Sequence, residues 1–191
     1  MLAGLAQRLR EAGRDVVTTH EPGGTALADA IRQLVLESDH PIAPVTEALL
    51  MSTARAQVVS DVIRPALNAG KCVLCDRYAM STLAYQGFGH GVPFEALRSL
   101  TTIATGGLEP DVVLLVDIPV GVSRARVAAR ATERGKPPDR LEREDEAFHA
   151  RVREGYLALA RGDRRVHVLD GLRPTIELID LAQRIVTAQP S

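Results

Sequence analysis

Aromatic residues are scarce in this chain, and tryptophan is absent. Only three Tyr and three Phe occur among 191 residues. Tyr78, Tyr85 and Phe88 all lie in one stretch, CDRYAMSTLAYQGFG at 75–89, beside an Asp-Arg pair and a Ser-Thr pair. This local concentration of aromatic and polar side chains indicates a surface that recognises a ligand.

Cysteine is nearly absent as well. Cys72 and Cys75 have C-x-x-C spacing, but they lie in KCVLCDR, which is typical of a buried strand. Residues three apart in a strand point to opposite faces, and no second Cys pair or His cluster completes a zinc site. The pattern predicts two reduced core cysteines.

Excess charge of one sign is also missing. The net charge is -1, so nothing in the overall charge draws the protein to a nucleic-acid polymer or a membrane. The sequence has no run of about 18 apolar residues, and its start, MLAGLAQRLREAG, is amphipathic rather than a leader. With 46% hydrophobic residues, we expect one cytoplasmic domain over 1–191.

Short Val-rich runs alternate with helical patterns along the chain. Near-continuous apolar runs suit parallel strands that are covered on both faces, so the sequence predicts a three-layer α/β fold. The predicted strands are 15–19, 71–76, 111–117 and 165–170. The predicted helices are 1–12, 26–37, 45–69, 93–105, 119–131, 140–161 and 174–187.

Polar loops follow these strands, where ligands bind in open parallel sheets. THEPGGT follows the first strand; Gly23 and Gly24 permit a close approach of backbone to ligand, and Thr25 can cap the next helix. By itself such a turn is weak evidence, because many strand-to-helix turns carry Gly and Thr for geometry alone.

DRYAMST, after the second strand, is more specific. Asp76 offers a carboxylate for hydrated Mg²⁺, and Arg77 offers a planar fork for phosphate. A pair that only caps the strand is the alternative from these two residues alone. Tyr85 and Gln86, one helical turn after the Ser-Thr pair, add groups suited to reading a base or a sugar.

Several motifs occur together in a known order and spacing: THEPGGT, ARAQVVSDVIRPALNAGKCVLCDRY, STLAYQG, PDVVLLVDIP and PPDRLE. Through these motifs, which extend over essentially its whole length, the chain resembles bacterial thymidylate kinases, the ATP:dTMP phosphotransferases. The resemblance implies a P-loop kinase fold with a five-stranded parallel sheet, and transfer of the γ-phosphoryl group of ATP to dTMP with Mg²⁺. It also implies a homodimer through the helix at 45–69, which has more apolar residues than one core face needs.

The resemblance implies roles for the phosphate site. Asp76 would hold Mg²⁺ through water, and Arg77 would grip the 5′-phosphate of dTMP. Arg32 would lie near the same phosphate, and Glu21 would face the reacting phosphates and the metal.

It also implies roles for the nucleoside site. Arg55 would hydrogen-bond thymine, assisted by Thr82 and Gln86, and Tyr85 would lie against the deoxyribose where a 2′-hydroxyl would clash. Met51 stands where relatives usually present a Phe that stacks on thymine. Met packs well on aromatic rings, at about 0.3–1.5 kcal/mol, but Met51 as ordinary core filler stays open.

The stretch ATERGKPPD at 131–139 predicts a mobile surface loop, because it is charged and carries one Gly and two Pro. By resemblance, 131–140 is a lid over ATP, and Arg130, Arg134 and Arg140 would bind ATP and stabilise charge on the transferring group. A solvated helix face is the alternative for any single arginine.

A phosphate-cradling G-x-x-x-x-G-K-[ST] motif does not occur in the printed sequence. Lys71 and Lys136 are the only lysines, and neither is followed by Ser or Thr. By resemblance, a central strand and that motif would directly precede the first helix. We therefore expect that the start codon was assigned at an internal Met. A naturally truncated, non-catalytic nucleotide-binding relative is the alternative. Without the strand, both neighbouring strands would have unpaired backbone groups, each costing about 1–3 kcal/mol.

Overall fold

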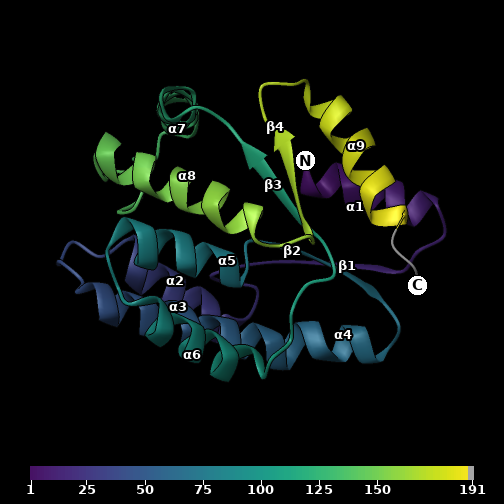
Figure 1. Cartoon of the computed structure of the whole chain (residues 1–191), viewed down its shortest axis with the longest axis horizontal. Helices are drawn as coiled ribbons and strands as arrows, with labels where there is room; N and C mark the ends of the chain where they lie inside the picture. The colour runs from purple at the N-terminus through teal and green to yellow at the C-terminus, as the bar shows by residue number, and fades with distance from the viewer. Residues whose placement is uncertain (189–191) are drawn as a thin grey trace.

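Helices surround two pairs of parallel strands in the computed structural model, which describes residues 1–188 (Figure 1). β1 (Val16–His20) pairs with β2 (Cys72–Asp76). β3 (Val113–Asp117) pairs with β4 (Val166–Asp170). All four predicted strands are confirmed within one or two residues, as is the parallel α/β class.

The sheet lies in two halves. Within residues 1–188, β2 is paired only with β1, and β3 only with β4. The described residues therefore form two separate two-stranded parallel sheets rather than the continuous five-stranded sheet that the resemblance implied. Cys72 and Cys75, on β2, are free thiols as predicted, although both are half-buried rather than fully in the core.

The helices cover both sides of the strands. α1 (Leu2–Glu11) packs against α9 (Thr175–Thr187), and Leu5, Leu9 and Ala182 are buried between them and β1. On another side, neighbouring helices pack together: α2 (Ala26–Leu36), α3 (Pro44–Val58) and α6 (Phe94–Thr105). The α3 helix continues through the wide turn η1 (Val59–Ile63) into α4 (Arg64–Asn68). The remaining helices are α5 (Ala79–Thr82), η2 (Leu83–Gly89), α7 (Val120–Arg134) and α8 (Glu146–Arg161).

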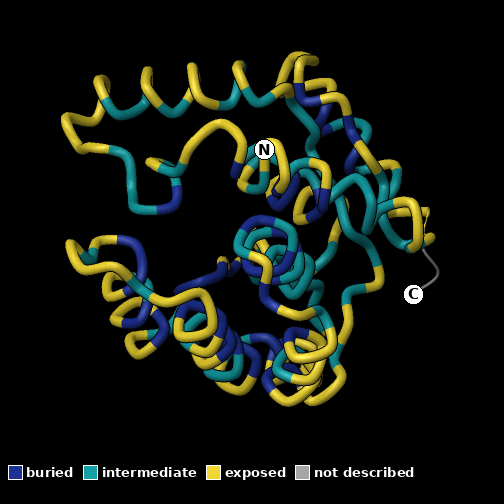
Figure 2. The backbone as a smooth tube through the Cα atoms, turned by 60° about the vertical axis from the view of Figure 1, so that its left-hand side comes forward, coloured by how far each residue is buried: buried dark blue, intermediate teal, exposed yellow. Residues whose placement is uncertain are grey.

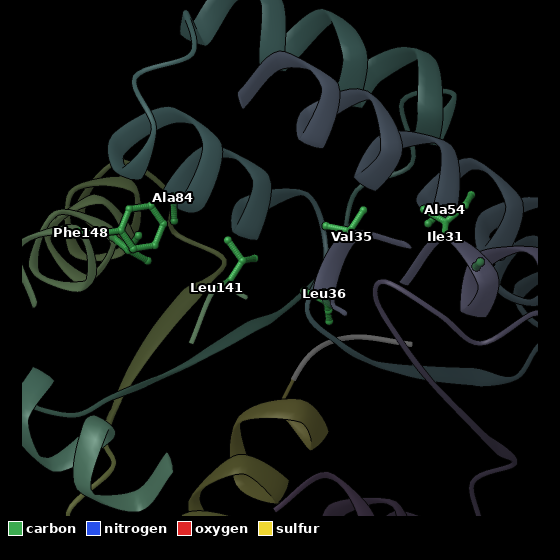
Figure 3. Packing of buried hydrophobic residues seen from close by; sticks show 9 residues of the cluster. Ile31, Val35, Leu36, Ala54, Ala84, Leu141 and Phe148 are labelled. Atoms are coloured by element: carbon green, nitrogen blue, oxygen red, sulfur yellow. The ribbon is translucent and has the colours of Figure 1, made fainter. Parts of the chain in front are cut away.

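The apolar core beneath the predicted ligand site joins α2, α3, η2 and α8. Figure 3 shows residues of this cluster, and Phe148 of α8 is 2% exposed. Figure 2 colours each residue by its burial, and the buried residues lie where the helices face the interior, whereas exposed residues lie on the outside. Helices far apart in the sequence are therefore fixed relative to one another at the site.

The helices differ from the prediction in three places. The sequence predicts no helix between 69 and 93, but α5 and η2 form a helical segment there, in which Gly87 and Gly89 allow close packing against aromatic rings. The α7 helix continues to Arg134 and ends at Gly135, whose φ of 61° is left-handed. The next helix, α8, begins at Glu146 rather than at the predicted residue 140, so the segment without helix is 135–145 instead of 131–139.

Gly155 is where α8 meets η2 most closely. A Cβ there would lie 2.5–2.7 Å from side-chain atoms of Phe88. We expect Gly155→Ala to lower the free energy of unfolding by about 1–3 kcal/mol through overpacking. The matched control is Gly121→Ala on α7, where nothing lies within 4 Å of the new Cβ. The control should be neutral or slightly stabilising in urea titrations, and equal losses in both variants would contradict the account.

Candidate functional site

A pocket opens beyond the carboxyl ends of β1 and β2. Its wall is formed by the turn after β1, by Arg77 after β2, by α2, α3, α5 and η2, and by residues within 139–142, before α8. The structure brings most of the predicted acceptor-site residues into this one wall: Glu21, Arg32, Met51, Arg55, Arg77, Thr82, Tyr85 and Gln86.

A buried ion pair forms the floor of the pocket. Arg55 Nε donates to Glu21 Oε2 at 2.7 Å, and Arg55 Nη1 donates to Thr82 Oγ1 at 2.9 Å. The two charged residues are only 3% and 5% exposed. Burial raises the pKa of the Glu21 carboxyl, and the Arg55 charge acts in the opposite direction. Arg55 Nη2 has no partner within residues 1–188, so Arg55 keeps a donor for a ligand.

Arg77 is held between two tyrosines. Its guanidinium lies 5.2 Å from the Tyr85 ring centroid, with Nη2 3.5 Å from that hydroxyl and Nη1 3.4 Å from the Tyr156 hydroxyl. Arg77 has a φ of 71°, the one left-handed non-glycine residue in the described part of the chain. Such strain collects at binding sites, where surrounding packing holds the residue in place.

Tyr156 is a site residue that the sequence did not reveal. Its hydroxyl donates to Ser81 Oγ at 2.7 Å, and burial raises its pKa. Tyr156 lies on α8, far from DRYAMST in the sequence, and no motif links the two segments. Tyrosine occurs only three times in the sequence, and this scarcity was the one feature that could have pointed to Tyr156.

The turn after β1 is fixed as the sequence indicated. Thr25 caps α2 by accepting from Ala28 N at 3.2 Å, and both glycines have positive φ, 133° for Gly23 and 88° for Gly24. Arg32 Nη1 donates to Pro22 O at 3.0 Å, which ties α2 to the turn. Arg32 therefore reaches the pocket from the same side as the turn.

Asp76 ends β2 beside this turn. Its carbonyl accepts from Glu21 N at 2.9 Å, so the ends of β1 and β2 are joined. Its carboxylate is exposed and has no partner in the part of the chain that the structure describes. Mg²⁺ is usually held by one or two carboxylates together with waters and substrate phosphates, so this free carboxylate fits the ion.

The predicted lid arginines are placed differently from one another. Arg140 meets the buried carboxylate of Glu47 and donates from Nε to Val35 O at 2.9 Å, at the end of α2. Arg130 pairs with Glu142, whereas Arg134 is exposed at the end of α7. The structure thus brings Arg140 next to the acceptor pocket and leaves Arg134 outside it. Glu47 and Glu142 are further polar residues here that the sequence did not indicate.

Parallel strands with an arginine-lined pocket at their carboxyl ends are typical of α/β proteins that bind phosphorylated ligands. The family model described as thymidylate kinase matches residues 1–181. Curated proteins named thymidylate kinase are similar over most of the chain. That of Deinococcus radiodurans is 48% identical over 178 residues, 93% of this chain and 84% of its own length. That of Geobacter sulfurreducens is 50% identical over 169 residues, 87% of this chain and 79% of its own length. That of Thermomicrobium roseum is 48% identical over 186 residues, 96% and 85% of the two chains. The chain belongs to the thymidylate kinase family.

The buried ion pair between Glu21 and Arg55 leads to a prediction about the stability of the protein. Glu21→Gln leaves the buried Arg55 charge without a counter-charge, and we expect the free energy of unfolding to fall by about 3 kcal/mol. Glu109→Gln is the control, because Glu109 is exposed where it pairs with Arg165 and should change stability by less than about 1 kcal/mol. Denaturant titration measures both, and an undiminished stability in Glu21→Gln would contradict the buried pair.

Proposed function

We propose that the chain phosphorylates dTMP to dTDP with ATP as the phosphoryl donor. One observation carries the proposal: Arg77, whose guanidinium suits a phosphate, lines the same pocket as Arg55 and Gln86, whose side chains suit a base. Family membership assigns the reaction, and the pocket supplies groups for each part of dTMP.

Different residues of the pocket suit the phosphate, the sugar and the base of dTMP. The 5′-phosphate lies against Arg77, and Arg32, which is tied to the turn after β1, lines the same pocket. The deoxyribose lies along Tyr85, and the thymine ring packs on Met51 with its polar edge toward Arg55 and Gln86. Thr82 keeps the Arg55 guanidinium in position.

Catalysis in this scheme is mainly positioning and charge stabilisation. A phosphate oxygen of dTMP attacks the γ-phosphorus of ATP, and the bond to ADP breaks. Mg²⁺, when bound, neutralises charge on the phosphates. Asp76 would hold this ion through water, and Glu21 fixes the floor beside it. Arg130 and Arg134 would bind ATP from the lid, whereas Arg140 lies beside the acceptor pocket.

A second candidate function is binding of dTMP without phosphoryl transfer. Both lysines of the chain are engaged elsewhere: Lys71 Nζ lies 3.1 Å from Asp15 Oδ2, and Lys136 Nζ lies 2.6 Å from Glu37 Oε1. Neither lines the pocket, so neither supplies the lysine of a phosphate loop.

We also propose a homodimer and a cytoplasmic location. Large apolar side chains are exposed on the adjacent helices α2, α3 and α6: Leu27, Leu34, Val45, Leu49 and Ile103. Exposed apolar side chains that gather on adjacent helices are typical of a protein interface. The two free thiols fit a reducing compartment, and no described helix is long and apolar enough to cross a membrane.

Arg77→Met tests the phosphate site. We expect the affinity for dTMP to fall by about 10- to 100-fold in calorimetric titrations, since charge-assisted hydrogen bonds to phosphate are lost. Arg8→Met is the control, because Arg8 pairs with Asp180 on the far helices. Unchanged binding in Arg77→Met would exclude this phosphate site. ADP release from Mg-ATP in the presence of dTMP separates the two functions, since a binding protein takes up dTMP without turnover.

Leu49→Glu tests the dimer. Leu49 is 48% exposed on α3, so a charge there should leave the fold intact and shift sedimentation from dimer to monomer. Leu172→Glu, at an equally exposed apolar position outside α2, α3 and α6, should leave the dimer unchanged. A wild-type chain that sediments as a monomer would refute the proposed assembly.

A further inference from the structure

Glu47 is a completely buried carboxylate behind the pocket, and neither the family comparison nor the sequence motifs assign it a role. It lies on α3 and is 0% exposed. Gln86 Nε2 donates to Glu47 Oε1 at 2.5 Å, and Arg140 donates to Glu47 Oε2. His90 Nε2 lies farther from Oε1, at 3.5 Å. A buried carboxylate is costly unless partners hold it, so its two oxygens define where these partners stand.

The carboxylate fixes which way the Gln86 amide points. Arg140 is always charged, so the carboxylate paired with it is ionised and only accepts hydrogen bonds. Gln86 must therefore turn its NH₂ group toward Glu47, because its carbonyl would meet another acceptor. Gln86 Oε1 has no partner within residues 1–188, and Gln86 lines the pocket. The group left for a ligand is an acceptor.

A hydrogen-bond acceptor at this place distinguishes thymine and uracil from cytosine. Thymine and uracil carry a hydrogen on ring nitrogen N3, whereas N3 of cytosine is an acceptor. Arg55, with its free Nη2, offers the neighbouring donor that suits a carbonyl. Buried polar groups left unpaired by the wrong ligand are a strong source of selectivity.

We propose that Glu47 is a positioning residue for base recognition. It holds the Gln86 amide so that the pocket offers a carbonyl oxygen and selects nucleotides whose pyrimidine N3 bears hydrogen over cytosine nucleotides. The inference rests on the proposed function, in that the pocket takes a pyrimidine nucleotide.

Glu47→Gln separates this role from simple packing. The new amide has one oxygen, and the charged Arg140 takes it because a charged donor binds an acceptor more strongly than a neutral one. The new NH₂ group then faces Gln86, whose amide must turn over and present NH₂ to the pocket. The substitution keeps the size of the side chain but reverses the hydrogen-bonding character offered to the base.

Calorimetric dissociation constants for dTMP, dUMP and dCMP on the 191-residue chain provide the test. The wild type should bind dTMP and dUMP more tightly than dCMP. In Glu47→Gln the ratio of the dCMP and dUMP dissociation constants should fall by about tenfold or more. The ratio for dUMP and dTMP, which differ only by the methyl group, should not change. Glu37→Gln, the same substitution at an exposed residue that pairs with Lys136, should leave both ratios unchanged.

A purely structural role predicts a different result, with all three nucleotides weakened equally and their ratios preserved; that result would overturn the inference. Failure of the wild type to bind dTMP would instead refute the proposed function. If Glu47→Gln does not fold, the side-chain NH₂ signals of Gln86 in the wild type still test the proposed orientation. These signals are assigned by their loss in Gln86→Met. They should exchange slowly with solvent and shift little when dTMP is added. A large shift, showing the NH₂ group against the base, would exclude the proposed orientation.

Discussion

The buried ion pair between Arg55 and Glu21 is the interaction on which the pocket depends. It joins the turn after β1 to the last turn of α3, and Thr82 adds the end of α5 to the same group. The hydrogen bond from Glu21 N to Asp76 O joins the two strand ends as well. Because these segments are far apart in sequence, the pair decides whether the pocket exists as one surface. Leaving either partner alone would bury an uncompensated charge.

A second buried carboxylate organises the other end of the pocket. Glu47 holds Gln86 and Arg140 much as Glu21 holds Arg55. Each carboxylate commits some donors of its partners and thereby determines which groups remain for a ligand. Arg77 differs, because its partners are tyrosine hydroxyls rather than carboxylates, so its positive charge is not neutralised. The pocket is therefore positive where a phosphate is expected and neutral where a base is expected.

Local patterns in the sequence were sufficient for the elements and for much of the site. The four strands follow from Val-rich runs, and the cap at Thr25 follows from its place before a helical pattern. Tyr156 and Glu47 could not be found this way, because α8 and α3 bring them to the pocket through tertiary packing. Likewise, the ion pairs that engage Arg130 and Arg140 depend on how the segment after α7 folds back.

A crystal structure of this chain with dTMP tests the account most directly. The account predicts the 5′-phosphate against Arg77 and the thymine ring beside Met51, with its N3 hydrogen directed at Gln86 Oε1. A nucleotide bound elsewhere, or one whose base points away from Arg55 and Gln86, would contradict it.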